Sequence, residues 1–195
     1  MPDFSQIQLI IFDWNGVLAK GKAPYIFPIE VLDGFSLKID TKSDAVFCVG
    51  GTNWIAELKK LGVDVSNGET LDRISGRMFE YSKENGLIGL YDWVGEKIPQ
   101  LAKNTTLAIL SNNSQASLDH GLKNMRRHFD LVKGWENVPA LKPSPEGILG
   151  ICRELGIAPA KTLMVGDSEE DRLAAENAGV KVYIVKSGEC PDFFK

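Results

Sequence analysis

The sequence has no long hydrophobic run and no excess of positive charge. Its longest uninterrupted apolar run, Ala45–Val49, is too short to cross a bilayer. The net charge of -4 at pH 7 provides no basic footprint for nucleic acid and no polybasic cluster for an anionic membrane. We therefore expect neither a nucleic-acid partner nor a membrane partner.

The sequence also has few cysteines and no recognisable targeting segment. Cys48, Cys152 and Cys190 are odd in number and widely spaced, which is typical of neither a disulfide framework nor a metal site. The first residues, Met1–Phe4, lack the basic start of a signal peptide, and no long apolar stretch follows them. These features predict a cytoplasmic protein, in a compartment where thiols stay reduced.

The chain does contain enough apolar residues to build a core. Of its 195 residues, 44% are hydrophobic and 25% are charged, which is the composition of an ordinary globular protein and excludes disorder as the main state. The length suits one domain, or a core of roughly 100–150 residues with a smaller insert.

Short apolar runs alternate with helical patterns along most of the chain. Continuous runs rich in Ile, Leu and Val predict strands that are buried on both faces. The runs are Gln8–Phe12, Thr106–Leu110, Thr162–Val165, Lys181–Val185 and a weaker one at Leu131–Trp135. The expected helices are Ser114–Arg127, Pro145–Leu155, Glu169–Ala178 and Trp93–Ala102, the last kinked or broken by Pro99. This alternation predicts an α/β fold, a parallel sheet with helices on both faces.

One stretch departs from the alternation. Within it, Ala45–Val49 is either a short strand or a buried turn of helix, and two helices are expected, one ending at Lys60 and one over Gly68–Asn85. We therefore predict a small, mainly helical insert at residues 20–86, inside a core formed by residues 1–19 and 87–195.

Polar side chains follow three of the predicted strands at the point where each ends. Asp13, Ser111 and Asp167 occupy these positions. Parallel sheets of this kind bind ligands at the carboxyl ends of their strands. The sequence thus predicts a site that these three residues share.

Four segments suit phosphoryl transfer when they are taken together: Phe12–Leu18, Leu110–Asn113, Leu141–Pro145 and Val165–Asp171. A carboxylate attacks a phosphoryl group poorly unless negative charge is neutralised. A divalent cation on carboxylates and a lysine ammonium would do this. Each segment alone has a simpler explanation, such as a turn residue, a helix cap or a solvated loop lysine. Those explanations do not account for all four at these strand ends.

These four segments resemble, in order, the signature motifs of the haloacid dehalogenase superfamily. The resemblance covers residues 7–19 and about 88–188. It implies a Rossmann-like core, with a helical cap inserted after the first strand at residues 20–86. It also implies a small phosphorylated substrate, whereas the sequence gives no prediction of an oligomeric state.

The resemblance implies a Mg²⁺ site. Asp13 would be both nucleophile and metal ligand. The main-chain carbonyl of Asn15 and the carboxylate of Asp167 would complete the set, and Asp171 would support the metal directly or through water.

The resemblance also implies a phosphate site. Ser111 and Lys142 would grip the phosphate, and Asn112 would help through its backbone or side chain. Trp14, next to the nucleophile, either faces the cap and substrate or is a packing residue.

Asn15 departs from the family pattern. Phosphatases of the family carry an acid at this position, which protonates the leaving group and then activates water. An amide does not exchange a proton near neutral pH, and such acid–base catalysis is typically worth about 10²–10⁴-fold. A phosphatase would then be slow, or specialised for good leaving groups such as acyl phosphates.

Two alternatives stay open beside the phosphatase. One is a non-catalytic phospho-ligand-binding protein. The other is a different hydrolase of the family, either a dehalogenase or a phosphonate hydrolase that uses a cap lysine such as Lys59 or Lys60. Arg73 and Arg77, one helical turn apart, form a solvated face or reach a substrate anion.

Overall fold

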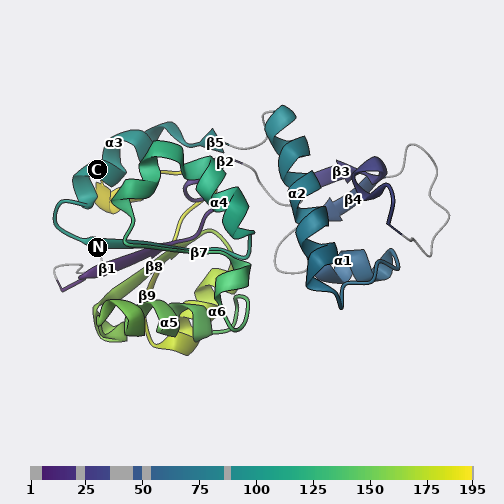
Figure 1. Ribbon diagram of the computed structural model, residues 1–195. Coiled ribbons are helices and arrows are strands. Elements are labelled where there is room, and N and C mark those ends of the chain that lie inside the picture. The colour runs from purple at the N-terminus through teal and green to yellow at the C-terminus, as the bar shows by residue number, and fades with distance from the viewer. Residues whose placement is uncertain (1–5, 21–24, 36–45, 50–53, 86–88, 195) are drawn as a thin grey trace. The chain divides into compact units, whose positions relative to one another are not determined.

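The chain forms two compact units, one comprising residues 1–20 and 89–195 and the other residues 21–88. The computed structural model describes residues 6–20, 25–35, 46–49, 54–85 and 89–194 (Figure 1). We refer to the two units as the core unit and the insert. The sequence predicts an insert at residues 20–86, and the second unit comprises residues 21–88.

A five-stranded parallel sheet forms the centre of the core unit. Its strand order is β7-β6-β1-β8-β9, and every neighbouring pair is parallel. The strands are β1 (Leu9–Phe12), β6 (Thr106–Leu110), β7 (Leu131–Lys133), β8 (Thr162–Gly166) and β9 (Lys181–Ile184). All five coincide with predicted runs. In the central strand, Phe12 lies opposite both Ile109 and Val165, so the strands end at one edge of the sheet.

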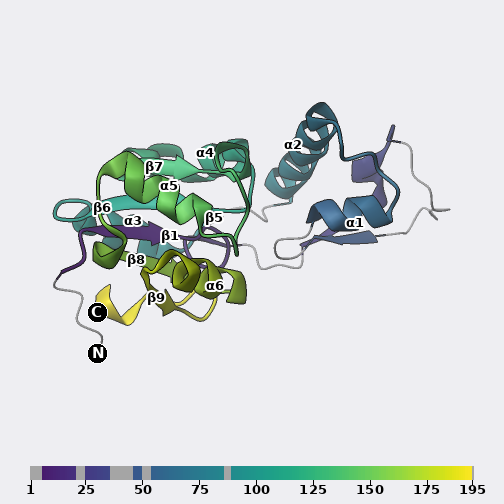
Figure 2. The same ribbon diagram turned by 90° about the horizontal axis from the view of Figure 1, so that it is seen from below.

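Helices cover both faces of this sheet, as expected (Figure 1). Ile10 and Phe12 of β1 belong to a cluster with α3 (Asp92–Leu101) and α4 (Gln115–Leu122). Leu9 and Ile11 belong to the opposite cluster, which includes α5 (Glu146–Leu155) and α6 (Glu169–Ala178). The last two helices pack against each other (Figure 2). Since strand side chains alternate in direction, each strand supplies both layers.

Two helix predictions need correction. The helix expected over Ser114–Arg127 ends at Leu122, because Lys123 adopts a positive φ of 47° and the chain continues as a 3₁₀ turn, Lys123–His128. That turn leads into Phe129, whose buried ring packs edge-on against Phe12. Pro99 does not break α3 and lies inside it, two residues before its last residue, Leu101. The absent N–H of Pro99 therefore costs one hydrogen bond without ending the helix.

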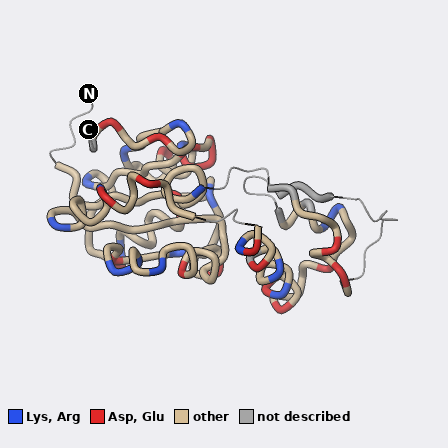
Figure 3. The backbone as a smooth tube through the Cα atoms, turned by 90° about the horizontal axis from the view of Figure 1, so that it is seen from above, with Lys and Arg blue, Asp and Glu red and all other residues tan. Residues whose placement is uncertain are grey.

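The insert combines helices with a small sheet that the sequence did not reveal. β3 (Tyr25–Pro28) pairs antiparallel with β4 (Val46–Val49), so the ambiguous run at Ala45–Val49 is a strand. Two helices follow, α1 (Trp54–Lys60) and α2 (Gly68–Glu84). The second begins where the Asn67 side chain accepts the N–H of Glu69. Acidic and basic residues are interspersed along it (Figure 3).

The two chain crossings leave the core unit side by side. β2 (Ala19–Lys20) pairs antiparallel with β5 (Gly89–Leu90), with Ala19 opposite Leu90 and Lys20 opposite Gly89. Among the described residues, no helix has the length and apolarity needed to span a membrane. Two of the three cysteines, Cys152 and Cys190, carry free thiols, and the side chain of Cys48 lies outside the described part.

Candidate active site

The polar residues that follow β1, β6 and β8 meet at one edge of the sheet. The N–H of Asp13 donates to the Val165 carbonyl at 2.8 Å, and the N–H of Ser111 donates to the Lys133 carbonyl at 3.0 Å. These bonds extend the parallel ladders one residue past the strands, so they fix where both side chains start. Asp13, Asp167 and Asp171 each offer an oxygen within 4.8 Å of the others.

Lys142 joins two carboxylates at the centre of the site. Its Nζ lies 2.6 Å from Oδ1 of Asp13 and 2.5 Å from Oδ1 of Asp171. The lysine side chain is 5% exposed and Asp171 is fully buried. Because the three charges are removed from water, each depends on the others for stabilisation. The ammonium is therefore held beside the atom that would attack a phosphoryl group.

Asp171 organises the loop after β8 with its second oxygen. Oδ2 accepts the N–H of Asp167 at 3.2 Å, and the N–H and hydroxyl of Ser168 at 3.1 and 2.6 Å. Ser168 Oγ in turn accepts the N–H of Asp171, which completes a capping box at the start of α6. Both carboxylate oxygens of Asp171 thus have partners, and the loop that carries Asp167 is fixed.

Burial controls the proton equilibria of the site. Removal from water raises the pKa of Asp13 to about 7; the nearby Lys142 ammonium opposes this rise and the Asp171 charge adds to it. Burial pulls the pKa of Lys142 down, but Asp13 and Asp171 together outweigh it and hold that pKa above its usual value. Lys142 is thus a fixed positive charge, and Asp13 titrates near neutrality.

The Asn112 side chain forms two hydrogen bonds with the backbone of Lys142. Its Oδ1 accepts the Lys142 N–H at 3.0 Å, and its Nδ2 donates to the Lys142 carbonyl at 3.2 Å. This two-point contact links the loop after β6 to the loop before α5. Of the two modes expected for Asn112, the side chain is engaged in holding Lys142, which leaves the backbone for a phosphate.

Gly16 lies directly against the Asp167 carboxylate. Its φ is +76°, and a Cβ at this position would collide with the Asp167 carboxylate and lie 2.9 Å from Ser187 Oγ. The Gly16 carbonyl accepts the N–H of Gly188 at 2.7 Å, and its own N–H donates to the Ala19 carbonyl at 3.0 Å. A glycine is therefore required here on two grounds, conformation and space.

The structure supports packing as the role of Trp14, and corrects the expectation that it could line the substrate site. Its side chain is 1% exposed and belongs to the core cluster shared with α3 and α4. The indole lies so close to Gly121 of α4 that a Cβ on that glycine would clash with the ring. The Trp14 side chain thus points into the core. The main-chain carbonyl of Trp14 accepts the N–H groups of Leu18 and Ala19.

The donor set fits a hard divalent cation. Asp13 and Asp167 supply carboxylate oxygens, and carboxylates with a main-chain carbonyl such as that of Asn15 are ligands that Mg²⁺ accepts. A cation held there would also stabilise the charged form of the Asp13 carboxylate, whose pKa is raised by burial. Because both oxygens of Asp171 are hydrogen-bonded, this residue would act by fixing Asp167.

The candidate cations of the insert have other contacts. Arg73 and Arg77 both stack on the ring of Phe35, 4.9 and 5.3 Å from its centroid. Arg77 also donates to the carbonyls of Val31 and Asp33. These contacts favour a structural role within the insert, with both side chains also lining an open groove. Lys59 and Lys60 lie exposed in the last turn of α1.

Known proteins share this fold and these sequence features. The family described as haloacid dehalogenase-like hydrolase matches residues 10–185. A phosphoglycolate phosphatase of Psychrobacter arcticus is 30% identical over 200 residues, which cover 89% of this chain and 80% of that protein. The pyrophosphatase PpaX of Bacillus cereus is 31% identical over 114 residues, 57% of this chain and about half, 53%, of the relative.

The solved structures agree on the fold. The crystal structure of CbbY from Rhodobacter sphaeroides in complex with phosphate has a TM-score of 0.67 and 20% identity, covering 92% of this chain and 86% of that one. A crystal structure of a haloacid dehalogenase-superfamily hydrolase from Geobacter sulfurreducens has a TM-score of 0.57 and 24% identity, with 90% and 88% covered.

Proposed function

The chain belongs to the haloacid dehalogenase-like hydrolase family, and on that premise we propose that it is a metal-dependent phosphatase using Asp13 as nucleophile. The observation that carries the proposal is the buried Lys142 ammonium, 2.6 Å from the Asp13 carboxylate at the carboxyl edge of the sheet. Parallel sheets bind ligands at this edge, so a buried lysine beside a strand-end carboxylate there favours a role in ligand binding over a purely structural one.

The first step transfers the phosphoryl group to Asp13. A carboxylate oxygen of Asp13 bonds to phosphorus, the bond from phosphorus to the leaving oxygen breaks, and the leaving group takes the electron pair. Lys142 offsets the charge that the dianion brings to Asp13. The Ser111 hydroxyl and N–H groups of the loop that follows would hold the other phosphate oxygens.

The second step returns Asp13 to its starting state. Water attacks phosphorus, the bond to Asp13 breaks with its electron pair on the carboxylate, and phosphate leaves carrying both protons of the water as dihydrogen phosphate. Asp13 and Asp167, with the Asn15 carbonyl, would hold Mg²⁺, which supplies further charge neutralisation at the phosphate. Asp171 keeps Asp167 and Lys142 in place for both steps.

Asn15 directs the proposal toward particular substrates. Its amide neither donates a proton to a leaving oxygen nor removes one from water. Leaving groups that depart as stable anions, as in acyl phosphates and phosphoanhydrides, depend least on that proton. Two relatives are named as a phosphatase of a small phosphorylated metabolite and as a pyrophosphatase, which is consistent with a small phosphorylated substrate. The insert would act as the cap that selects it.

Asn15 also favours a second candidate, a phospho-ligand-binding protein without turnover. A panel of acyl phosphates, phosphoanhydrides and alkyl phosphates separates the two. We expect Mg²⁺-dependent phosphate release that Asp13→Asn abolishes, fastest with acyl phosphates. Tight binding of phosphate with no turnover of any compound would instead support the binding protein, and activity that persists in Asp13→Asn or without metal would exclude the mechanism.

A single substitution tests the role of Asn15. We expect Asn15→Asp to raise kcat/KM for alkyl phosphates by about 10²-fold, within the range of general acid–base catalysis, and to change acyl phosphate hydrolysis much less. The ratio of the two rates is the measurement. An equal effect on both substrates would show that proton transfer at this position is not the missing element.

A borohydride-trapped adduct with phosphonoacetaldehyde would instead identify a phosphonate hydrolase.

A further inference from the structure

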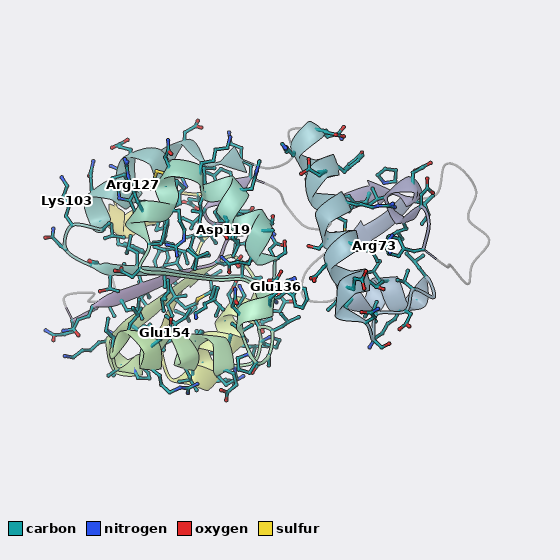
Figure 4. The ribbon with its side chains drawn as sticks, in the orientation of Figure 1. Arg73, Lys103, Asp119, Arg127, Glu136 and Glu154 are labelled. Carbon is teal, nitrogen blue, oxygen red and sulfur yellow. The ribbon has the colours of Figure 1, made fainter. Side chains whose placement is uncertain are left out.

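Gln115 joins two loops at the carboxyl edge of the sheet. It is the first residue of α4 and directly follows the polar loop Ser111–Ser114. Its side-chain oxygen accepts the N–H of Gly134 at 2.9 Å and the Nδ2 of Asn137 at 2.8 Å, both from the segment after β7. Its own N–H donates to Oε2 of Glu136 at 2.9 Å. Glu136 is labelled in Figure 4.

Backbone contacts interlock the same two segments. The N–H of Trp135 donates to the Asn113 carbonyl at 2.9 Å. Gly134 packs so tightly on the polar loop that a Cβ there would lie 2.5 Å from the Gln115 nitrogen and 2.9 Å from the Asn113 oxygen. The segment after β7 is therefore a support on which the loop Ser111–Ser114 rests.

We propose that Gln115 is a positioning residue for phosphate binding, which it serves by holding the loop Ser111–Ser114 in its binding conformation. This inference rests on the proposed function, in which that loop contacts the phosphate. Within the loop, Asn113 N–H donates to Ser111 Oγ at 3.2 Å. Other contacts of the loop include those of Asn112 with Lys142 and those with the segment after β7, so this segment supplies part of the support of the loop. A loop that must be ordered at the moment of binding binds more weakly, because the entropy lost on ordering opposes binding.

Capping of α4 does not explain the Gln115 side chain. The cap is Ser114, whose Oγ accepts the N–H of Ser117 at 3.2 Å. The Gln115 oxygen accepts the buried Gly134 N–H, and the Gln115 Nε2 donates to Oδ1 of Asp119, in the same helix, at 3.2 Å. The loop also carries Asn112, which holds the backbone of Lys142, so displacement of the loop would disturb the ammonium as well.

The test separates phosphate binding from metal binding. Gln115→Leu keeps the side-chain volume and removes the acceptor, whereas Gln115→Glu keeps an acceptor oxygen for Gly134 and Asn137. The second variant also carries Asp119→Asn, because Gln115 Nε2 donates to Asp119 Oδ1 at 3.2 Å and a carboxylate in place of that amide would be repelled by Asp119. The measurements are the Kd of Mg²⁺ alone and the Kd of inorganic phosphate at saturating Mg²⁺, by calorimetry. We expect Gln115→Leu to weaken phosphate binding about tenfold and Mg²⁺ binding less than about twofold, because the carboxylates sit on other strands. Gln115→Glu should recover most of the loss.

Two further variants keep the test decisive. Asn137→Ala removes one donor at the surface and should weaken phosphate binding by about two- to threefold even if Gln115→Leu fails to fold. Gln100→Leu, an exposed change on α3, is the matched control and should alter neither Kd. The inference is overturned if phosphate affinity is unchanged in both loop variants, if Mg²⁺ affinity falls in parallel, if Gln115→Glu is no better than Gln115→Leu, or if the native protein binds no phosphate. Phosphate binding without turnover would overturn only the proposed function.

Discussion

Gly16 leaves room for the Asp167 carboxylate by having no side chain. Two features require a glycine at position 16, the positive φ and the lack of space for a Cβ beside Asp167. A glycine of the insert has the first feature without the second. Gly34 has a similar φ of +79° but no atom within 4 Å of the position a Cβ would occupy. Comparing alanine substitutions at Gly16 and Gly34 therefore distinguishes the effect of backbone strain from the effect of displacing the Asp167 carboxylate.

We expect Gly16→Ala to weaken Mg²⁺ binding at least about tenfold and to abolish phosphate release, because the new Cβ must push Asp167 aside. Gly34→Ala should cost about 1 kcal/mol of stability from strain and leave Mg²⁺ binding unchanged. Isothermal calorimetry with Mg²⁺ on both variants is the measurement. Equal Mg²⁺ affinity in Gly16→Ala and the native protein would show that Asp167 is not a ligand.

Asp13 should lower the stability of the protein that carries it. Folding raises its pKa from 3.8 to about 7, so between these values the folded state binds a proton that the unfolded state does not. Stability therefore falls as pH rises through this range, by at most about 4 kcal/mol if each tenfold change in the proton equilibrium is worth about 1.4 kcal/mol.

We expect Asp13→Asn, without metal, to raise the melting temperature by several degrees at pH 8 and by little at pH 4. Thermal denaturation at the two pH values, with chelator present, measures the difference. A melting temperature that falls at pH 8 would indicate that the ion pair with Lys142 outweighs the cost of burying the carboxylate.

At the residue level, the sequence located the strand-end groups well. Asp13 and Ser111 meet because parallel strands end at a common edge, which an apolar run and its polar successor already indicate. The direction of the Trp14 side chain and the contacts of Gln115 could not be predicted in this way. The direction of Trp14 depends on where α4 passes, and the contacts of Gln115 come from a segment about 20 residues away, so neither leaves a local signal.

At the scale of elements, α4 packs closely on Trp14, the residue that follows Asp13. Gly121 brings the helix against the indole of Trp14, the residue next to Asp13. Ala normally stabilises a helix relative to Gly by about 0.5–1 kcal/mol. In α2, Gly76 has open space where a Cβ would lie and provides the reference for that gain.

We expect Gly121→Ala to lower the free energy of unfolding by about 1–3 kcal/mol and to reduce kcat, because the indole must move and the Asp13 loop moves with it. Gly76→Ala should raise stability by about 0.5–1 kcal/mol without changing kcat. Urea denaturation and steady-state kinetics supply both quantities. Similar stabilisation by the two substitutions would mean that α4 yields to the indole without strain.

β1, β6 and β8 were predictable because each is a continuous apolar run that lies largely buried in the middle of the sheet. β7 and β9 are apolar runs at the two edges of that sheet, and β9 is only partly buried, with Ile184 44% exposed. β3 was not predicted, since Tyr25–Pro28 ends in a proline and its partner in the described structure, β4, lies beyond a segment with no period of its own. The end of α4 was missed for a related reason. Leu118 and Leu122 keep helical spacing with Met125, but the chain must turn at Lys123 to bring Phe129 under the sheet.

At the scale of the whole molecule, the core unit has a hydrophobic core of its own. Two buried clusters lie on the two faces of its sheet, and all the described residues that form them come from residues 9–19 or 94–185. The site residues Asp13, Ser111, Lys142 and Asp167 also belong to the core unit. The core unit should therefore fold by itself.

We expect a chain in which a short Gly-Ser linker replaces residues 21–88 to unfold cooperatively and to bind Mg²⁺ within about threefold of the native Kd. Its selectivity among phosphorylated substrates should fall, since the insert would no longer choose them. Near-ultraviolet circular dichroism and calorimetry test the first part, and the substrate panel tests the second. A product without fixed tertiary structure would show that the insert contributes to core stability.

The short ladder between β2 and β5 also bears on how such a chain changes over generations. Lys20 and Gly89 are paired across this ladder, so the inserted segment, residues 21–88, leaves the core unit and returns to it at neighbouring positions. Additions or losses there would leave the strand register untouched, so the machinery could stay constant while its choice of ligand drifts.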